Sequence, residues 1–91
     1  MELTAKKIVF SGRVQGIGFR FTALNIASRC QLTGYVRNIP DGNVEMVAQG
    51  PAETIDECIR DLQDSFVGSI SHIDIEPATP DPKFTDFRIT F

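Results

Sequence analysis

The spacing of apolar residues changes along the chain between a period of two and a helical period, and each change marks a new element. Over residues 7–14 apolar and polar side chains alternate, with Ile8, Phe10 and Val14 on one face, which predicts a strand. From Phe19 the spacing becomes helical, with an apolar stripe made of Phe19, Ala23, Ile26, Ala27 and Cys30. We expect this helix to end near Leu32.

The middle of the chain predicts a hairpin followed by a second helix. Residues 34–50 hold two strand-like runs separated by Pro40, Asp41 and Gly42, which are residue types that favour a tight turn. Residues 50–66 then form an amphipathic helix, with Pro51 suited to its first turn. The apolar stripe of this helix consists of Ile55, Cys58, Ile59, Leu62 and Phe66.

The last third of the chain returns to alternation. Residues 69–76 predict a strand in which Ile70 is out of phase with Ile73 and Ile75. A proline-containing loop leads to a short C-terminal strand with Phe87, Ile89 and Phe91 on one face. Strand, helix, strand, strand, helix, strand and a final strand predict an α+β, ferredoxin-like two-layer sandwich. Both helices would cover one face of a mainly antiparallel sheet.

Length and composition indicate one ordinary globular domain over residues 1–91. The chain is 42% hydrophobic and 23% charged, which is usual for a compact domain. No apolar run approaches the length of a membrane span, and the first residues contain no secretory apolar segment. We therefore expect a cytoplasmic protein that does not bind membranes, with a monomer as the default state.

Cysteine and histidine give no metal or redox pattern. The two cysteines, Cys30 and Cys58, match no ligand or redox spacing, and both fall on apolar helix stripes. This favours two buried free thiols over a disulfide. The one histidine, His72, is expected to be an exposed strand residue and not a metal ligand.

Charge is distributed unevenly in this acidic protein. Residues 1–38 carry six basic side chains and one acidic, whereas residues 39–91 carry three basic and eleven acidic. A net charge of −3 argues against broad nucleic-acid binding. The basic half suits a small anion, although chance segregation of surface charges would give the same pattern.

The stretch "GRVQGIGFRF", residues 12–21, is the strongest candidate for a binding site. It lacks the Lys-Ser/Thr ending of a phosphate-binding P-loop and the third glycine and domain size of a dinucleotide fingerprint. A tight strand-to-helix turn would not explain why Arg20 lies in the first helical turn, where the helix dipole disfavours a cation. Free N–H groups brought together by Gly16 and Gly18, with Arg20 beside them, favour a site for a phosphate-sized anion.

Asn38 is the remaining polar candidate, at the end of the strand that leads into the hairpin turn. On its residues alone it is better interpreted as a turn residue whose side chain satisfies nearby backbone groups. No serine or cysteine stands beside a plausible base, so the sequence offers no covalent nucleophile.

"GRVQGIGFR", then "GYVRNIPDGNVE" after one helix, and the "FRITF" ending together resemble the acylphosphatase family over nearly the whole chain. The resemblance implies a metal-independent enzyme without a cofactor, which hydrolyses acyl phosphates. It implies that Arg20 is the catalytic arginine and that Asn38 positions the attacking water. The implied phosphate-binding residues are Gln15, Gly16, Ile17, Gly18, Phe19 and Arg20.

The departures from the family pattern are small. Tyr35 stands where the family often has tryptophan, and Phe91 stands where tyrosine is common. Both are expected to preserve apolar packing. The implied partners are a small-molecule acyl phosphate and inorganic phosphate, as product and inhibitor. A catalytically silent anion-binding module stays an alternative, whereas an RNA-binding domain is disfavoured because the strand "NVEMVAQG" carries no aromatic residue.

Overall fold

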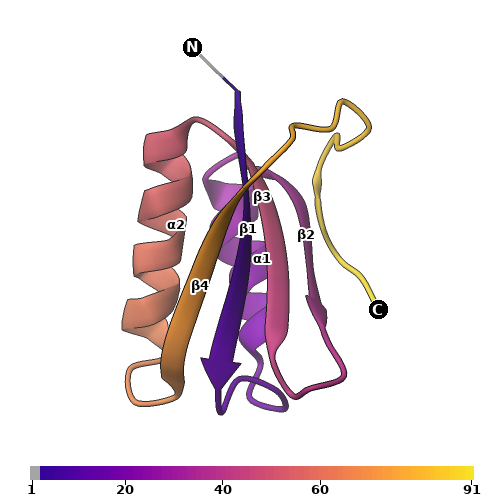
Figure 1. The fold of residues 1–91 in the computed structure, drawn as a ribbon. Coiled ribbons are helices and arrows are strands. Elements are labelled where there is room, and N and C mark those ends of the chain that lie inside the picture. Colours follow the sequence, from indigo (N-terminus) through magenta and orange to yellow (C-terminus); the bar gives the residue numbers. More distant parts are fainter. Residues whose placement is uncertain (1–2) are drawn as a thin grey trace.

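A five-stranded sheet covered on one face by two helices makes up the computed structural model, which describes residues 3–91 (Figure 1). The predicted two-layer sandwich and the predicted order of elements are confirmed. In chain order the elements are β1 (Thr4–Gly12), α1 (Phe19–Arg29), β2 (Thr33–Asn38), β3 (Val44–Gly50), α2 (Ala52–Ser65), β4 (Ile70–Ala78) and β5 (Phe87–Ile89).

The strands follow the order β4-β1-β3-β2-β5 across the sheet. β1 pairs antiparallel with both β3 and β4, and β2 pairs antiparallel with β3. β5 is the exception, since it runs parallel to β2 at the edge of the sheet. The mainly antiparallel sheet is therefore as predicted, and this order places β1 and β3 at its centre.

The core lies between the sheet and the helices, and it anchors the first residue of α1. The Phe19 ring is 4.8 Å from the Phe10 ring and 4.9 Å from the Phe66 ring, centroid to centroid. Phe10 and Phe19 are both fully buried, so β1, α1 and the end of α2 meet at one aromatic cluster. Aromatic pairs at this separation stabilise beyond their buried area, and the cluster fixes where α1 begins.

The observed limits of β1 and α1 differ from the predicted ones. β1 begins at Thr4 and ends at Gly12, so Val14 lies outside the strand although it is buried. α1 ends at Arg29 and not near Leu32, because Gln31 takes a left-handed φ of 59° that a helix cannot continue. Leu32 packs in the core although it lies outside the helix.

Three residues at element ends also depart from expectation. Pro51 is the N-cap of α2 and does not belong to its first turn. Cys30 follows α1 and is only half-buried, so the prediction that both cysteines are buried is wrong for Cys30. Phe91 lies beyond β5 and is 96% exposed, so its expected contribution to apolar packing is also wrong.

The second cysteine agrees with its prediction. Cys58 is buried on α2, and both cysteines are free thiols. Burial raises the pKa of the Cys58 thiol to about 12. Its thiolate is therefore scarce at neutral pH, which makes it a packing residue and not a reactive one.

Three connections meet at the same end of the sheet, the lower end in Figure 1. They are the β1–α1 loop, the β2–β3 turn and the connection from α2 to β4. The Arg13 N–H donates to the carbonyl of Ser69, 2.8 Å away, and so ties the first connection to the third. None of the helices in the described part of the chain is long and apolar enough to cross a membrane.

Candidate active site

The β1–α1 loop contains two glycines whose backbone angles other residues rarely adopt. Gly16 has φ 78° and Gly18 has φ 82°. A side-chain Cβ built on either would meet no atom within 4 Å. The glycines are needed for the backbone conformation and not for close packing, and the space beside them is open to a ligand.

The same loop presents unpaired backbone donors. Gly18 caps α1 in a left-handed conformation, no side chain caps the helix, and its first turn has no acidic residue. The first backbone bond of the helix runs from the Thr22 N–H to the Gly18 carbonyl at 3.1 Å. Within residues 3–91, the N–H groups of residues 15–21 have no acceptor. Free donors and the positive end of the helix dipole make this end of α1 attractive to anions.

Arg20 adds a full positive charge at this helix end. It is half-buried in the first turn of α1, and it forms no ion pair with any residue that the structure describes. Its guanidinium carbon lies 5.6 Å from the centroid of the Phe91 ring. Because Phe91 follows β5, Arg20 lies on the flank of α1 that faces the β2–β5 edge of the sheet.

Asn38 is the last residue of β2, and its side chain is on the core-facing side of the sheet. It alternates in phase with buried Val36 and pairs across the strands with buried Val44. Its Oδ1 atom is buried and has no hydrogen-bond partner among the described residues. The following turn is held by Asn43, whose backbone N–H and side-chain amide both donate to the Asp41 carboxylate. The Asn38 amide therefore takes no part in the hydrogen bonds of the turn.

The Gln15 side chain joins the loop to this turn. Its Nε2 donates to the carbonyl of Ile39 at 3.0 Å and to the carbonyl of Asn43 at 2.9 Å. These bonds span 24 and 28 positions of sequence. The side-chain amide is thus committed to the hairpin, and only the backbone N–H of Gln15 is free for an anion. The bonds hold the loop at a fixed position relative to the residue after Asn38.

Of the residues implied by the family resemblance, the structure places Gln15 to Arg20 in one loop and helix end, and Asn38 on the strand whose turn Gln15 holds. Two features were missed by sequence reasoning: the hairpin bonds of the Gln15 side chain and the position of Phe91 beside Arg20. No local sequence signal reports either contact, since both join segments far apart in the chain.

A second polar cluster lies on the opposite, open face of the sheet. The Glu45 carboxylate accepts hydrogen bonds from the Tyr35 hydroxyl and the Arg37 Nε, both at 2.9 Å, and Lys7 lies 3.8 Å away. Burial alone would raise the pKa of Glu45, but the hydrogen bonds from Arg37 and Tyr35 outweigh it and hold the pKa below its usual value. Burial, and then the bond to Glu45, raise the pKa of Tyr35.

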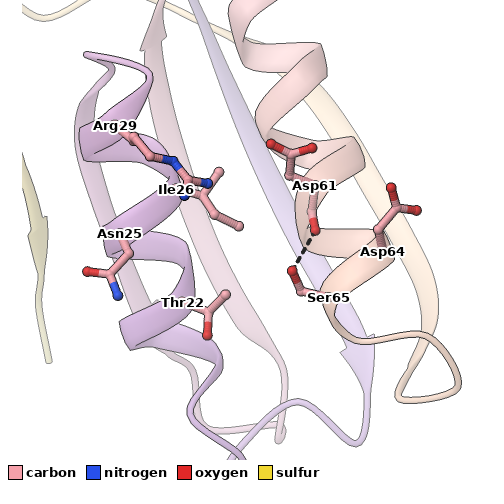
Figure 2. Close-up of a pocket in the computed structure, with 7 residues that line it drawn as sticks. All are labelled: Thr22, Asn25, Ile26, Arg29, Asp61, Asp64 and Ser65. Carbon is pink, nitrogen blue, oxygen red and sulfur yellow. Dashed lines mark hydrogen bonds between the residues drawn. The ribbon is translucent and has the colours of Figure 1, made fainter.

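Three surface hollows lie away from the loop. The groove in Figure 2, of about 550 Å³, lies between α1 and α2 and is lined by residues such as Thr22, Arg29 and Asp61. Two others, of about 430 and 370 Å³, lie at the α2–β4 connection and beside β5. None of the three is lined by residues 15–20 or by Asn38.

Metal-binding side chains do not gather in the described residues: residues 3–91 contain no group of three or more histidines, cysteines or acids placed to hold an ion. Together, the sandwich and the donor-rich helix end define a class of protein, a ferredoxin-like domain with a candidate site for a small anion at its first strand–helix loop.

Comparison with known proteins gives the family. The family model for acylphosphatase matches residues 6–89. The acylphosphatase of Chlorobaculum tepidum is 41% identical over 83 residues, which are 90% of each chain. That of Lactobacillus gasseri is 37% identical over 83 residues, covering 89% of this chain and 91% of the relative. The chain therefore belongs to the acylphosphatase family, as its motifs indicated.

Solved structures agree with this placement. The crystal structure of acylphosphatase from Bacillus subtilis has a TM-score of 0.88 at 28% identity, covering 99% of this chain and 100% of the other. A crystal structure of full-length HypF in a phosphate- and nucleotide-bound form matches with a TM-score of 0.89 at 29% identity. The match covers 99% of this chain but 12% of HypF, so the same fold also occurs as a small part of a much larger protein.

Proposed function

We propose that this chain hydrolyses the carboxyl–phosphate bond of acyl phosphates, releasing a carboxylate and inorganic phosphate. Family membership and relatives named acylphosphatase support the proposal. One observation of the structure carries it: the unpaired N–H groups of residues 15–21 stand beside an arginine without an ionic partner. Such an arrangement is favourable when a phosphate group occupies it.

In this proposal the phosphoryl group binds to the loop of residues 15–19 and to Arg20. The loop amides donate to its oxygens, and the planar guanidinium can donate two parallel hydrogen bonds. Phosphoryl transfer depends mainly on positioning and on stabilising charge at the phosphoryl oxygens. Arg20 and the loop supply both, so the proposed reaction needs no metal ion and no cofactor.

Asn38 would orient the attacking water. A neutral amide is too weak a base to deprotonate water, but it can fix its direction. The support is the Oδ1 atom of Asn38, a buried acceptor without a donor, since such atoms are rare and call for a partner. A water bound there would donate to Oδ1 and present its own oxygen to phosphorus.

The chemistry explains why the chain needs no stronger acid or base. Water forms a bond to phosphorus as the bond from phosphorus to the acyl oxygen breaks, and the proton of the water passes to a phosphoryl oxygen. The leaving group is a carboxylate, whose conjugate acid has a pKa of about 4, so it departs without protonation. Two well-placed groups and a donor-rich loop are sufficient for this reaction class.

The direct test follows the hydrolysis of benzoyl phosphate by the purified protein in the presence of EDTA. We expect steady turnover that inorganic phosphate inhibits competitively, because product and substrate share the loop. Activity that appears only when a divalent metal is added would refute the metal-independent reaction. Phosphate binding without turnover would identify a silent anion-binding module instead.

The variant Asn38→Ala separates binding from chemistry. Turnover should fall on the order of 10²–10³-fold, as when one well-placed polar group of an active site is removed. Phosphate affinity should stay unchanged and the urea midpoint should not fall, because the Asn38 side chain makes no hydrogen bond within residues 3–91 and its buried Oδ1 has no partner there to lose. Asn43→Ala is the matched control: it removes the side-chain bond to Asp41 and should lower the urea midpoint but leave turnover intact.

The physiological setting follows from the same proposal. We propose a cytoplasmic monomer whose substrate is a small molecule, with no nucleic-acid partner. The acidic net charge of −3 supports the last point, since a polyanion would be repelled by most of the surface. Size-exclusion chromatography with light scattering tests the monomer directly.

A further inference from the structure

Phe91 is the most exposed of the large apolar side chains in the described part of the chain. It is 96% exposed, yet its ring lies beside Arg20, with the guanidinium carbon 5.6 Å from the ring centroid. A cation at this distance from an aromatic face is attracted to it. The contact places an otherwise solvated apolar surface directly next to the proposed phosphate site.

We propose that the Phe91 ring is the contact surface for the acyl group of the substrate. It would then favour acyl phosphates with an aromatic or extended apolar acyl group over acetyl phosphate. This inference rests on the proposed function, because it assumes that Arg20 holds the phosphoryl group. It adds the chemical class of acyl group, which the shared phosphate chemistry leaves open.

The reach of the substrate supports this assignment. A phosphoryl oxygen bound to the guanidinium lies about 2.8 Å from its nitrogen atoms. A single bridging oxygen joins the acyl carbon to phosphorus, so an acyl substituent begins only a few bonds from the atoms that Arg20 holds. Aromatic rings interact at centroid separations of about 4.5–7 Å. A benzoyl ring attached to a phosphate on Arg20 can therefore reach the Phe91 ring.

A second exposed apolar side chain belongs to the loop itself. Ile17 is part of the anion loop and is 37% exposed, with no polar group on its side chain. No ion pair with Arg20 occurs in the part of the chain that the structure describes. The two exposed apolar side chains, Phe91 beside the guanidinium and Ile17 in the loop, match an apolar acyl group better than a charged one.

The interhelical groove is a poorer candidate for the acyl group. It lies on the flank of α1 that faces α2, where Asp61 and Asp64 line it (Figure 2). Arg20 lies on the other flank, beside the end of β5. Two carboxylates would also repel a substrate that carries a phosphate.

Phe21 offers a matched control for Phe91. It is also an exposed phenylalanine, 68% exposed, and it follows Arg20 directly in sequence. On a helix, however, successive residues point about 100° apart, and the cation–π contact of Arg20 is with Phe91. Truncating Phe21 therefore removes an equal apolar side chain from α1 without touching the proposed acyl surface.

The experiment measures kcat/KM for benzoyl phosphate and for acetyl phosphate in four proteins: the wild type, Phe91→Ala, Phe91→Leu and Phe21→Ala. Phe91→Ala should lower kcat/KM for benzoyl phosphate about three- to tenfold, the range of one lost aromatic pair, and leave acetyl phosphate nearly unchanged. For Phe91→Leu, kcat/KM for benzoyl phosphate should lie between the values of the wild type and Phe91→Ala, because leucine keeps apolar area but lacks the ring. Phe21→Ala should leave the ratio of the two substrates as in the wild type.

Three outcomes would overturn the inference. An equal loss for both substrates would show that the ring acts through the position of Arg20 and not on the acyl group. If Phe91→Ala left the ratio of kcat/KM for benzoyl phosphate to kcat/KM for acetyl phosphate unchanged, the acyl group would not touch Phe91. If Phe21→Ala lowered this ratio as much as Phe91→Ala, general surface apolarity would be responsible.

A binding measurement keeps this test separate from the proposed function. If the wild type hydrolysed neither substrate, the proposed function would fail, and the acyl contact would be judged by affinity alone. The probes are the non-hydrolysable benzoylphosphonate and acetylphosphonate. Phe91→Ala should weaken the first and not the second, and equal affinities of the wild type for both would overturn the acyl contact.

Discussion

Arg37 and Asn38 are neighbours on β2, and their side chains belong to opposite kinds of polar environment. Arg37 lies on the open face of the sheet, where its Nε donates a hydrogen bond to the Glu45 carboxylate, so its guanidinium is bonded within the protein. Asn38 lies on the core-facing side. Over residues 3–91 its Oδ1 has no hydrogen-bond partner, and Arg20 at the same end of the sheet has no ionic partner. The difference separates a polar side chain that is bonded within the fold from one that the proposed function would use.

In the cluster on the open face of the sheet, made of Lys7, Tyr35, Arg37 and Glu45, the charged groups are paired with one another. The Glu45 carboxylate receives bonds from Tyr35 and Arg37, and its pKa is lowered by them against the effect of burial. The bond to Glu45 in turn raises the pKa of Arg37. Each charge is satisfied by another side chain, so the cluster has little left to offer a ligand. The loop end has the reverse property, since in the proposed function its donors and its cation bind an external anion.

The largest expected effect tests the β1–α1 loop and Arg20 directly. Arg20→Lys should reduce turnover on the order of 10²-fold or more, because lysine keeps the charge but loses the planar pair of donors. Phosphate affinity should fall as well, and circular dichroism should report an intact fold. Arg37→Lys is the control in the cluster on the open face of the sheet. It should lower stability and leave kcat within about twofold of the wild type, as is usual for a change outside the site.

If Arg20→Lys kept most of the activity, the arginine would act only as a point charge. If instead Arg37→Lys lost as much activity as Arg20→Lys, the distinction between the two polar environments would fail.

An intermediate effect is expected from the link between the loop and the turn. Gln15→Ala removes both hydrogen bonds to the carbonyls of Ile39 and Asn43 and frees the loop to move relative to Asn38. Small misplacements of catalytic groups are costly, and we expect kcat to fall about tenfold, with a modest loss of phosphate affinity.

The control for Gln15 is Gln49, whose side chain also makes two bonds to backbone, both with Asp81. Gln49→Ala should be destabilised to a similar degree but keep its kcat. Equal kcat in the two variants would show that the loop does not need its link to the turn.

The smallest effect on turnover is expected from a change at Glu45, in the cluster on the open face of the sheet. Glu45→Gln should leave kcat unchanged and lower stability by about 1–2 kcal/mol at neutral pH, since hydrogen bonds to a charged group are weakened. The pKa of Glu45 is lowered in the folded protein, so its contribution to stability is present above the unfolded pKa and lost as pH falls through the folded pKa. Urea unfolding between pH 7 and pH 3 should therefore show the two proteins converging in acid.

A stability difference that persisted unchanged to pH 3 would mean that the Glu45 charge contributes nothing. Loss of activity in Glu45→Gln at neutral pH, with the fold intact, would place the open face in the catalytic machinery.

Local patterns predicted most of the fold because helix and strand periods depend on neighbouring residues. The stripe of α1 and the Pro40–Gly42 turn were visible in the sequence, and so was the conflict between Arg20 and the helix dipole. The end of α1 was predicted too late because the residue that takes the left-handed conformation after the helix is Gln31 and not a glycine, the usual signal of a helix end.

The contacts that sequence could not predict are those between distant segments. Gln15 meets the turn through bonds that span 24 and 28 positions, and only the packed sheet brings these parts together. Phe91 continues the alternation of Phe87 and Ile89, and the sequence therefore suggests a buried side chain. The preceding residue, Thr90, is still held by a backbone hydrogen bond from its N–H to the Val36 carbonyl, but Phe91 is exposed. The pattern continues to Phe91, while the core that would bury it has ended.

The unpartnered Oδ1 of Asn38 has a consequence for how this protein could be improved. A buried acceptor without a donor costs about 1–3 kcal/mol of folding free energy. Substitutions that remove it would be favoured by any selection for thermostability alone, and they would erase the acceptor that the proposed reaction uses. Stability and activity are thus in conflict at this one atom. Consensus or heat-based engineering of this chain should therefore hold position 38 fixed.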